Sequence, residues 1–74
     1  ELAADLALAP DGTGYYILDA YGGIHVSSPD LPILTTRYDD REQWALDLEI
    51  LSDGSAYVLS RDGMIYHCKS SNEN

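Results

Sequence analysis

The residues best suited to chemistry are Asp19 and His25, which lie six positions apart in the stretch GYYILDAYGGIH. A carboxylate beside an imidazole can orient a general base or contribute to a metal site. A zinc site needs three or four closely spaced His, Cys or carboxylate ligands, and the chain has only two histidines and one cysteine. The spacing therefore predicts neither a metal centre nor a cofactor, and it leaves His25 as a strand residue that could contact a ligand.

His67 and Cys68 are the second pair that could do chemistry. Neighbouring strand residues point to opposite faces, so the imidazole cannot readily activate the thiol. The chain also has no phosphate-binding loop, nucleophile elbow or HExxH pattern. We therefore predict no catalytic residue and no enzyme. The alternative that retains catalysis is that this chain forms part of a hydrolase propeller, with Asp5, Asp19 and Asp47 near the axis of the ring.

Aromatic rings supply the remaining candidates. Tyr21 precedes two turn glycines, and Tyr38 and Trp44 flank the polar stretch DDREQ. Amphipathic rings on loops of a rigid scaffold can stack on sugars or on a protein. Together with Asp19 and His25, they form the predicted ligand-binding set. A carbohydrate-binding lectin is accordingly the main alternative function.

Composition narrows the classes of partner. Thirteen acidic residues against four basic ones give a formal net charge of −9. Nucleic acid and anionic membrane surfaces both attract clustered Lys and Arg, so neither is expected as a partner. No apolar run approaches the roughly 20 residues of a membrane span. One Cys, no Phe and six Tyr favour an extracellular or periplasmic protein.

An internal repeat defines the elements that must position these side chains. AADLALAPDGTGYYILDAYGGIHV aligns with ALDLEILSDGSAYVLSRDGMIYH at an offset of 42 residues, which becomes 41 after the first turn. This period is typical of propeller blades. Tyr16 and Tyr57 are equivalent and are both expected in the core, whereas Asp5 and Asp47 are expected at equivalent places near an end or axis of the assembly. Further aligned pairs are Ala3 with Ala45, Leu6 with Leu48, Leu8 with Ile50, Asp11 with Asp53, Gly12 with Gly54, Thr13 with Ser55, Ile17 with Val58, Leu18 with Leu59, Gly22 with Gly63 and Ile24 with Ile65.

Each repeat predicts an antiparallel meander. Apolar residues alternate with acids in the first strand, Asp-Gly marks a hairpin turn, and an apolar strand precedes a second glycine turn. The predicted fold class is all-β, with two tandem antiparallel β-meander repeats like propeller blades. The segment PILTT is expected as a short fourth strand of the first repeat. The predicted divisions of the single module 1–74 are repeat 1 with four strands (3–37), a linker or short helical turn (38–44), repeat 2 with three strands (45–69) and a polar tail (70–74).

Residues 39–51 also fit a helix. DDREQ offers capping boxes, and Trp44, Leu48 and Leu51 follow a helical spacing. An α+β fold of two helix-hairpin units would result. The alternation of apolar and acidic residues from Leu46 to Ile50 favours a strand instead.

The stretch DLALAPDGTGYYILDAYGGIH, residues 5–25, resembles repeats of bacterial β-propeller-like proteins with the pattern D-hydrophobic-PDG-x-GYY-hydrophobic-LD-x-x-GG-hydrophobic-H. The resemblance implies a β-repeat array and informs the fold more than any activity. The second repeat departs from the pattern at Met64, where the first has a turn glycine.

Two repeats cannot close a propeller, which takes roughly four to eight blades. A chain of 74 residues also buries only about 60% of its unfolded surface, so a solitary fold would be marginally stable. We therefore expect self-association or membership of a longer propeller, with a carbohydrate or protein as candidate ligand. The favoured function is a non-catalytic β-repeat module for binding or structure.

Overall fold

The computed structural model describes residues 3–71, which form two antiparallel sheets and contain no helix. Sheet 1 has the order β1-β2-β3, and sheet 2 has the order β4-β7-β6-β5. The strands are β1 (Ala3–Leu8), β2 (Tyr15–Asp19), β3 (Ile24–Val26), β4 (Leu34–Thr35), β5 (Ala45–Ile50), β6 (Ala56–Ser60) and β7 (Ile65–Ser70). The predicted all-β fold of two blade-like antiparallel repeats is confirmed.

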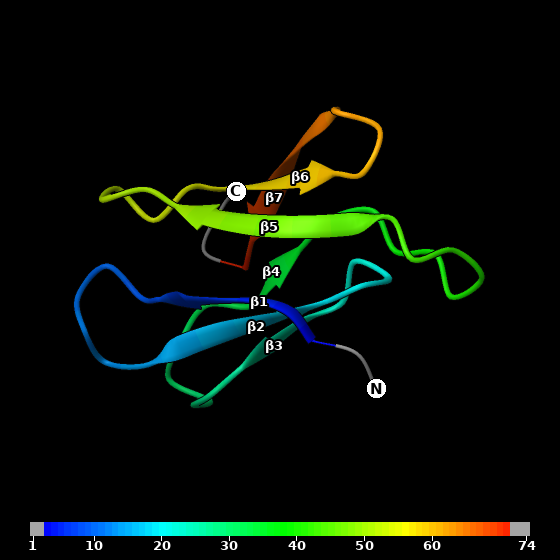
Figure 1. The fold of residues 1–74 in the computed structure, drawn as a ribbon. Coiled ribbons are helices and arrows are strands. Elements are labelled where there is room, and N and C mark those ends of the chain that lie inside the picture. Colours follow the sequence, from blue (N-terminus) through cyan, green and yellow to red (C-terminus); the bar gives the residue numbers. More distant parts are fainter. Residues whose placement is uncertain (1–2, 72–74) are drawn as a thin grey trace.

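The two repeats also share their strand register. The pairing of β1 with β2 shifts register after Ala3, and the pairing of β5 with β6 shifts register after Ala45. Figure 1 shows β1 and β5, the equivalent first strands, side by side and running in the same direction. The opposing pairs that recur are Asp5–Leu18 with Asp47–Leu59, Leu6–Ile17 with Leu48–Val58, and Leu8–Tyr15 with Ile50–Ala56.

The Asp-Gly turns have the same construction in both repeats. Asp11 Oδ1 accepts hydrogen bonds from the backbone N–H (3.0 Å) and the hydroxyl (2.6 Å) of Thr13. Asp53 Oδ1 accepts the same two bonds from Ser55, at 2.9 and 2.7 Å. These short-range bonds fix the turns from local sequence alone, as expected for Asx turns.

The fourth strand predicted for repeat 1 forms as β4, but it joins sheet 2. Leu34 lies opposite Ser70 of β7, and the Ser71 N–H donates to the Ile33 carbonyl at 2.8 Å. Prolines at positions 29 and 32 cannot donate to a sheet, so the chain leaves β3 before it becomes extended again. Leu34 then enters the core. Sheet 1 therefore has three strands rather than four, and sheet 2 has four rather than three.

The helical alternative for residues 39–51 is not observed. A turn at Asp40–Arg41 is followed by three residues without regular secondary structure and then by β5. The alternation of apolar and acidic residues from Leu46 to Ile50 therefore predicted the strand correctly. Leu48 packs in the core, and its contacts there stabilise this strand.

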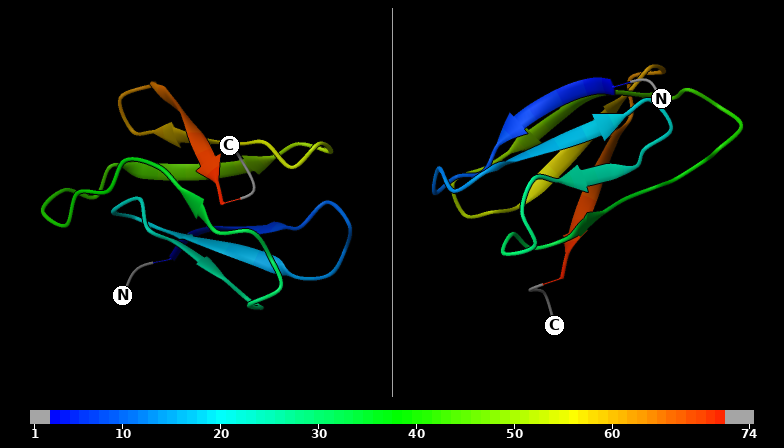
Figure 2. Two further views of the ribbon diagram at one scale, coloured as in Figure 1. Left: turned by 180° about the vertical axis from the view of Figure 1, so that it is seen from behind. Right: turned by 90° about the horizontal axis from the view of Figure 1, so that it is seen from below.

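The core lies between the sheets. Tyr16 and Leu18 of β2 face Leu48 and Val58 of sheet 2, and all four are buried. The two further views in Figure 2 show the sheets lying one over the other, with the segment from β3 to β5 wrapping around one end. Each sheet therefore has an inner face toward the other sheet and an outer face turned away from it.

Candidate functional site

Asp19 and His25 are brought together by the β2–β3 turn. Asp19 Oδ1 accepts hydrogen bonds from the backbone N–H groups of Tyr21 and Gly23, both at 2.9 Å. Asp19 Oδ2 lies 2.9 Å from His25 Nε2. Burial raises the pKa of Asp19, but the hydrogen bonds from His25, Gly23 and Tyr21 outweigh it and hold that pKa below its ordinary value. The ionised Asp19 carboxylate thus stabilises the turn through these hydrogen bonds.

A shallow cavity of about 290 Å³ adjoins this pair, and Ala3 and Ile17 complete its lining. The side chains of Ala3 and Ile17 are apolar, so they add surface but no reactive group to this cavity. Among residues 3–71, no group of three His, Cys, Asp or Glu side chains could hold a metal ion. The Asp19 carboxylate organises the β2–β3 turn through its bonds to the Tyr21 and Gly23 backbone.

The predicted aromatic set divides between the core and the surface. Trp44 is buried, its Nε1 donates to the Tyr21 carbonyl at 2.7 Å, and its ring packs edge-on against Tyr66 with centroids 5.1 Å apart. The Arg37 guanidinium covers the same ring at 4.7 Å. The structure therefore assigns Trp44 to the core, because it joins the loop before β5 to the turn after β2.

The two tyrosines of the set stay nearer to solvent. Tyr21 is half-buried, and its hydroxyl accepts a hydrogen bond from Gln43 Nε2 at 3.3 Å. Tyr38 is exposed. The structure thus gathers Asp19, His25 and Tyr21 at one turn and places Tyr38 on the neighbouring loop.

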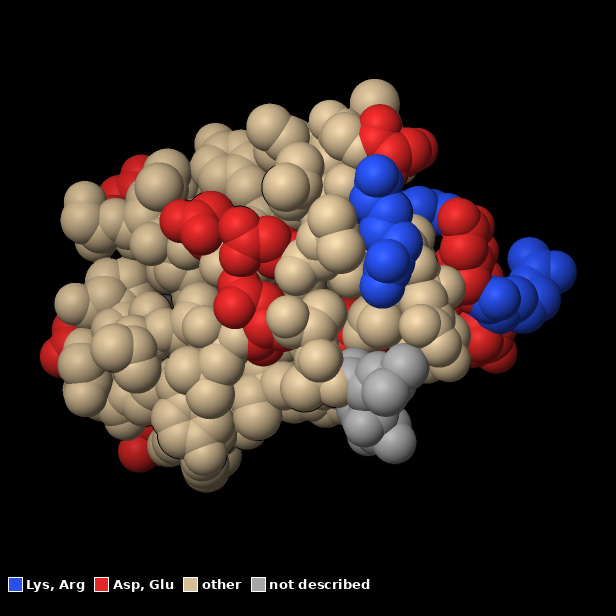
Figure 3. Space-filling view, viewed as in Figure 1, with Lys and Arg blue, Asp and Glu red and all other residues tan. Residues whose placement is uncertain are grey.

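Carboxylates gather where the two repeats meet, over β1 and β5, as Figure 3 shows. Asp5 Oδ2 accepts a hydrogen bond from the Leu48 N–H at 2.8 Å, which ties sheet 1 to sheet 2. The hydrogen bond with Asp5 raises the pKa of Asp47 to about 6, with further contributions from burial and from the charges of Asp5 and Glu49. Burial opposes ionisation of Asp5, yet its hydrogen bonds with Asp47 and Leu48 lower its pKa. The two carboxyl groups therefore share one proton below about pH 6.

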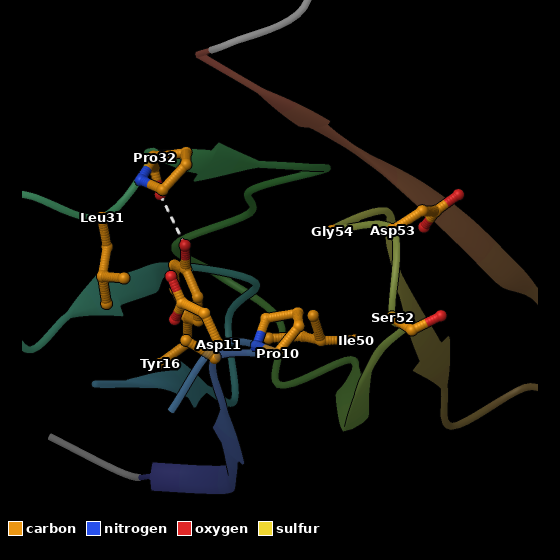
Figure 4. A pocket seen from close by; sticks show the side chains of 10 residues that line it. Pro10, Asp11, Tyr16, Leu31, Pro32, Ile50, Ser52, Asp53 and Gly54 are labelled. Carbon is orange, nitrogen blue, oxygen red and sulfur yellow. Dashed lines mark hydrogen bonds between the residues drawn. The ribbon is translucent and has the colours of Figure 1, made fainter. Parts of the chain in front are cut away.

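A second cavity, which the sequence did not predict, lies between the two Asp-Gly turns and measures about 250 Å³. Pro10, Tyr16 and Ile50 supply apolar surface there, and the Tyr16 hydroxyl donates to the Pro32 carbonyl at 2.8 Å. Figure 4 shows the Asp53 side chain directed away from Tyr16, and Asp53 is already bonded to its own turn. Asp11, which also lines the cavity, is likewise bonded to its own turn, so both carboxylates have local partners.

Cys68 is buried in the core, where burial raises the pKa of its thiol to about 11. The thiol therefore stays protonated at neutral pH and is a poor nucleophile. The neighbouring His67 side chain is exposed, on the opposite face of β7.

The outer faces of the sheets expose apolar residues that the sequence analysis did not single out. Sheet 1 exposes Leu6, Leu8 and Tyr15, and sheet 2 exposes Tyr57, Leu59 and Ile65. Tyr57 was expected in the core with Tyr16, but it is exposed while Tyr16 is buried. The repeat alignment could identify these positions as equivalent, but it could not show which copy of each would be covered.

Comparisons with protein-family models, curated proteins and solved structures find no match to this chain. Residues 3–71 contain no helix long and apolar enough to cross a membrane.

Proposed function

We propose that this chain is a non-catalytic β-repeat module that acts by packing its sheet faces against copies of itself or further repeats of its kind. The observation that carries the proposal is a pair of exposed apolar residues on each outer face, Leu6 and Leu8 on sheet 1 and Leu59 and Ile65 on sheet 2. Contiguous apolar surface on a soluble domain marks an interaction site. In a chain of 74 residues, burying that surface would also add to a small core.

The polar groups support a non-catalytic role. The Asp19 carboxylate is occupied by two backbone N–H groups and by His25. The Cys68 thiol is buried and protonated. The Asp5 carboxylate bonds to the Leu48 backbone across the sheets. Each group therefore has a role in holding the fold.

The carbohydrate-binding alternative draws less support from the geometry. Sugar sites rely on an exposed aromatic face, and the ring of Trp44 is covered by Arg37 and Tyr66. Tyr21 and Tyr38 remain as the aromatic residues that such a site would use.

The proposal is tested by light scattering behind size exclusion over a wide range of protein concentration. We expect masses that are multiples of 8.1 kDa and that rise with concentration. A mass of 8.1 kDa at every concentration would contradict self-association.

A further inference from the structure

We propose that copies of this chain associate head to tail, with the outer face of sheet 2 in one copy packed against the outer face of sheet 1 in the next. The inference rests on the proposed function and adds the polarity and residues of the contact. The occupant of each outer face is a second copy of this chain.

The first step concerns the outer face of sheet 2. Its residues Leu59 and Ile65 are equivalent to Leu18 and Ile24, which line the inner face of sheet 1. Leu18 is 0% exposed because sheet 2 covers it, whereas Leu59 is 37% exposed. The same kind of face is therefore covered in the first repeat and uncovered in the second.

The second step concerns the outer face of sheet 1, where the relation is reversed. Leu6 and Leu8 are equivalent to Leu48 and Ile50, which line the inner face of sheet 2. Leu48 is 2% exposed because sheet 1 covers it, whereas Leu6 is 55% exposed. The face that is buried in the second repeat is therefore equivalent to the face that is exposed in the first repeat.

The contact inside the molecule consequently joins two unlike faces, and each copy has one unpaired face of either type. The outer face of sheet 2 is equivalent to the inner face of sheet 1. The outer face of sheet 1 is equivalent to the inner face of sheet 2. Stacking copies head to tail repeats the internal contact between molecules. A contact between unlike faces is heterologous, so it gives a ring where the rotation between copies closes and a filament where it does not.

A polar contact marks the same geometry. Asp5 accepts a hydrogen bond from the backbone of Leu48 across the internal contact, at 2.8 Å. Asp47 is the equivalent of Asp5, and Leu6 is the equivalent of Leu48. Repeating the contact therefore brings the Asp47 carboxyl to the backbone of Leu6 in the next copy.

The contact between copies is not an identical replica of the internal one. Glu49 stands on sheet 2 where Ala7 stands on sheet 1, and Tyr15 stands where Ala56 is packed. A carboxylate and a larger ring must be accommodated, so the contact between copies is more polar than the internal contact. We expect reversible association that depends on protein concentration.

The test uses two variants of the full chain, each blocking one face. Leu8→Glu places a charge on the outer face of sheet 1, and Ile65→Glu places one on the outer face of sheet 2. Both side chains are well exposed, at 71% and 67%, so the fold should tolerate the changes. Ile33→Glu is the control, because Ile33 is an exposed apolar residue outside both faces. Circular dichroism and thermal melting check that all three variants are folded.

Each blocked variant alone should be monomeric, with self-association weakened roughly a hundredfold by the unpaired charge in the contact. An equimolar mixture of the two should form a one-to-one dimer and nothing larger, because it contains one intact face of each type. The control should assemble like the unaltered chain. Sedimentation velocity measures these four samples and the unaltered chain.

Three results would overturn the proposal. If one variant alone associates as the unaltered chain does, the contact joins like faces. If the mixture stays monomeric while the unaltered chain assembles, the faces do not pair with each other, although self-association itself stands. If the unaltered chain is monomeric throughout, the second copy is not the occupant, and the self-association in the proposed function fails with it.

Discussion

Two carboxyl groups meet where β1 and β5 lie side by side, and only one of them ionises easily. Asp5 accepts the backbone N–H of Leu48 and retains its charge, while the pKa of Asp47 rises to about 6. A carboxyl group with a raised pKa binds its proton more tightly in the folded chain than in the unfolded chain. Stability from Asp47 is therefore largest at low pH and is lost as the pH rises from about 4 to about 6.

Replacing Asp47 by asparagine should remove this loss. At pH 7.5 we expect Asp47→Asn to raise the free energy of unfolding by about 1 kcal/mol, because the amide cannot repel the Asp5 carboxylate. At pH 4, where Asp47 is protonated in the native chain, the two proteins should differ little. Urea denaturation at both pH values measures the difference.

Asp40→Asn serves as the control for the lost negative charge, because Asp40 is exposed on the loop before β5. Because this side chain is exposed, its replacement should change the free energy of unfolding by less than about 0.5 kcal/mol at either pH. A stabilisation by Asp47→Asn that is the same at pH 4 and pH 7.5 would contradict the shared proton.

Gly22 and Gly63 occupy equivalent turns but have different surroundings. Both have positive φ, at 99° and 88°. A Cβ at Gly22 would collide with the Arg37 carbonyl and the Trp44 ring, whereas a Cβ at Gly63 would meet nothing within 4 Å. Gly63→Ala should therefore cost only the backbone strain, about 1 kcal/mol, and Gly22→Ala should cost several kcal/mol. Comparable melting temperatures for the two variants would show that the loop over Gly22 moves away freely.

At the scale of the strands, β4 is the element that ties the halves together. It follows the first repeat in sequence, yet it completes the sheet of the second. Its Leu34 fills the core beside β7, and its neighbour Ile33 points a mostly exposed side chain outward. The short strand therefore contributes packing as well as hydrogen bonds.

Leu34→Ala should lower the free energy of unfolding by about 2–4 kcal/mol, because it leaves a cavity under sheet 2. Ile33→Ala, one residue earlier, should change it by less than about 0.5 kcal/mol, since the side chain is largely in solvent already. Chemical denaturation of both variants gives the comparison. Equal effects would mean that β4 does not hold Leu34 in the core.

Local sequence predicted the elements well and their partners less well. Alternation and Asp-Gly turns were sufficient for the first two strands of each repeat, because the relevant contacts are near in the chain. The pairing of Leu34 with Ser70 joins distant segments and carries no local pattern. Trp44 was expected on the ligand-binding surface, but Arg37 and Tyr66 cover its ring. Tyr66 is distant from Trp44 in the sequence, so no local pattern could predict that contact. Asp19 and His25 are close in the chain, and their contact could be anticipated.

At the scale of the whole molecule, association must overcome electrostatic repulsion. Each copy carries a formal net charge of −9, and the Debye length falls from about 10 Å at 0.1 M salt to about 3 Å at 1 M. We therefore expect self-association to strengthen as sodium chloride rises from 50 to 500 mM, on the order of tenfold. Sedimentation equilibrium at several salt concentrations measures this dependence. Weakening by salt would instead indicate that ion pairs, rather than apolar faces, hold the copies together.

The position of β4 has a consequence for synthesis of the chain. Sheet 1 can pair all three of its strands once Val26 has left the ribosome. β4 emerges next, but β7, the strand it pairs with, is made last among those described. The segment that carries Leu34 must therefore wait beside a finished first sheet while β5, β6 and β7 are translated. Among the described strands, the pairing of β4 with β7 can therefore form only after every other strand has been made.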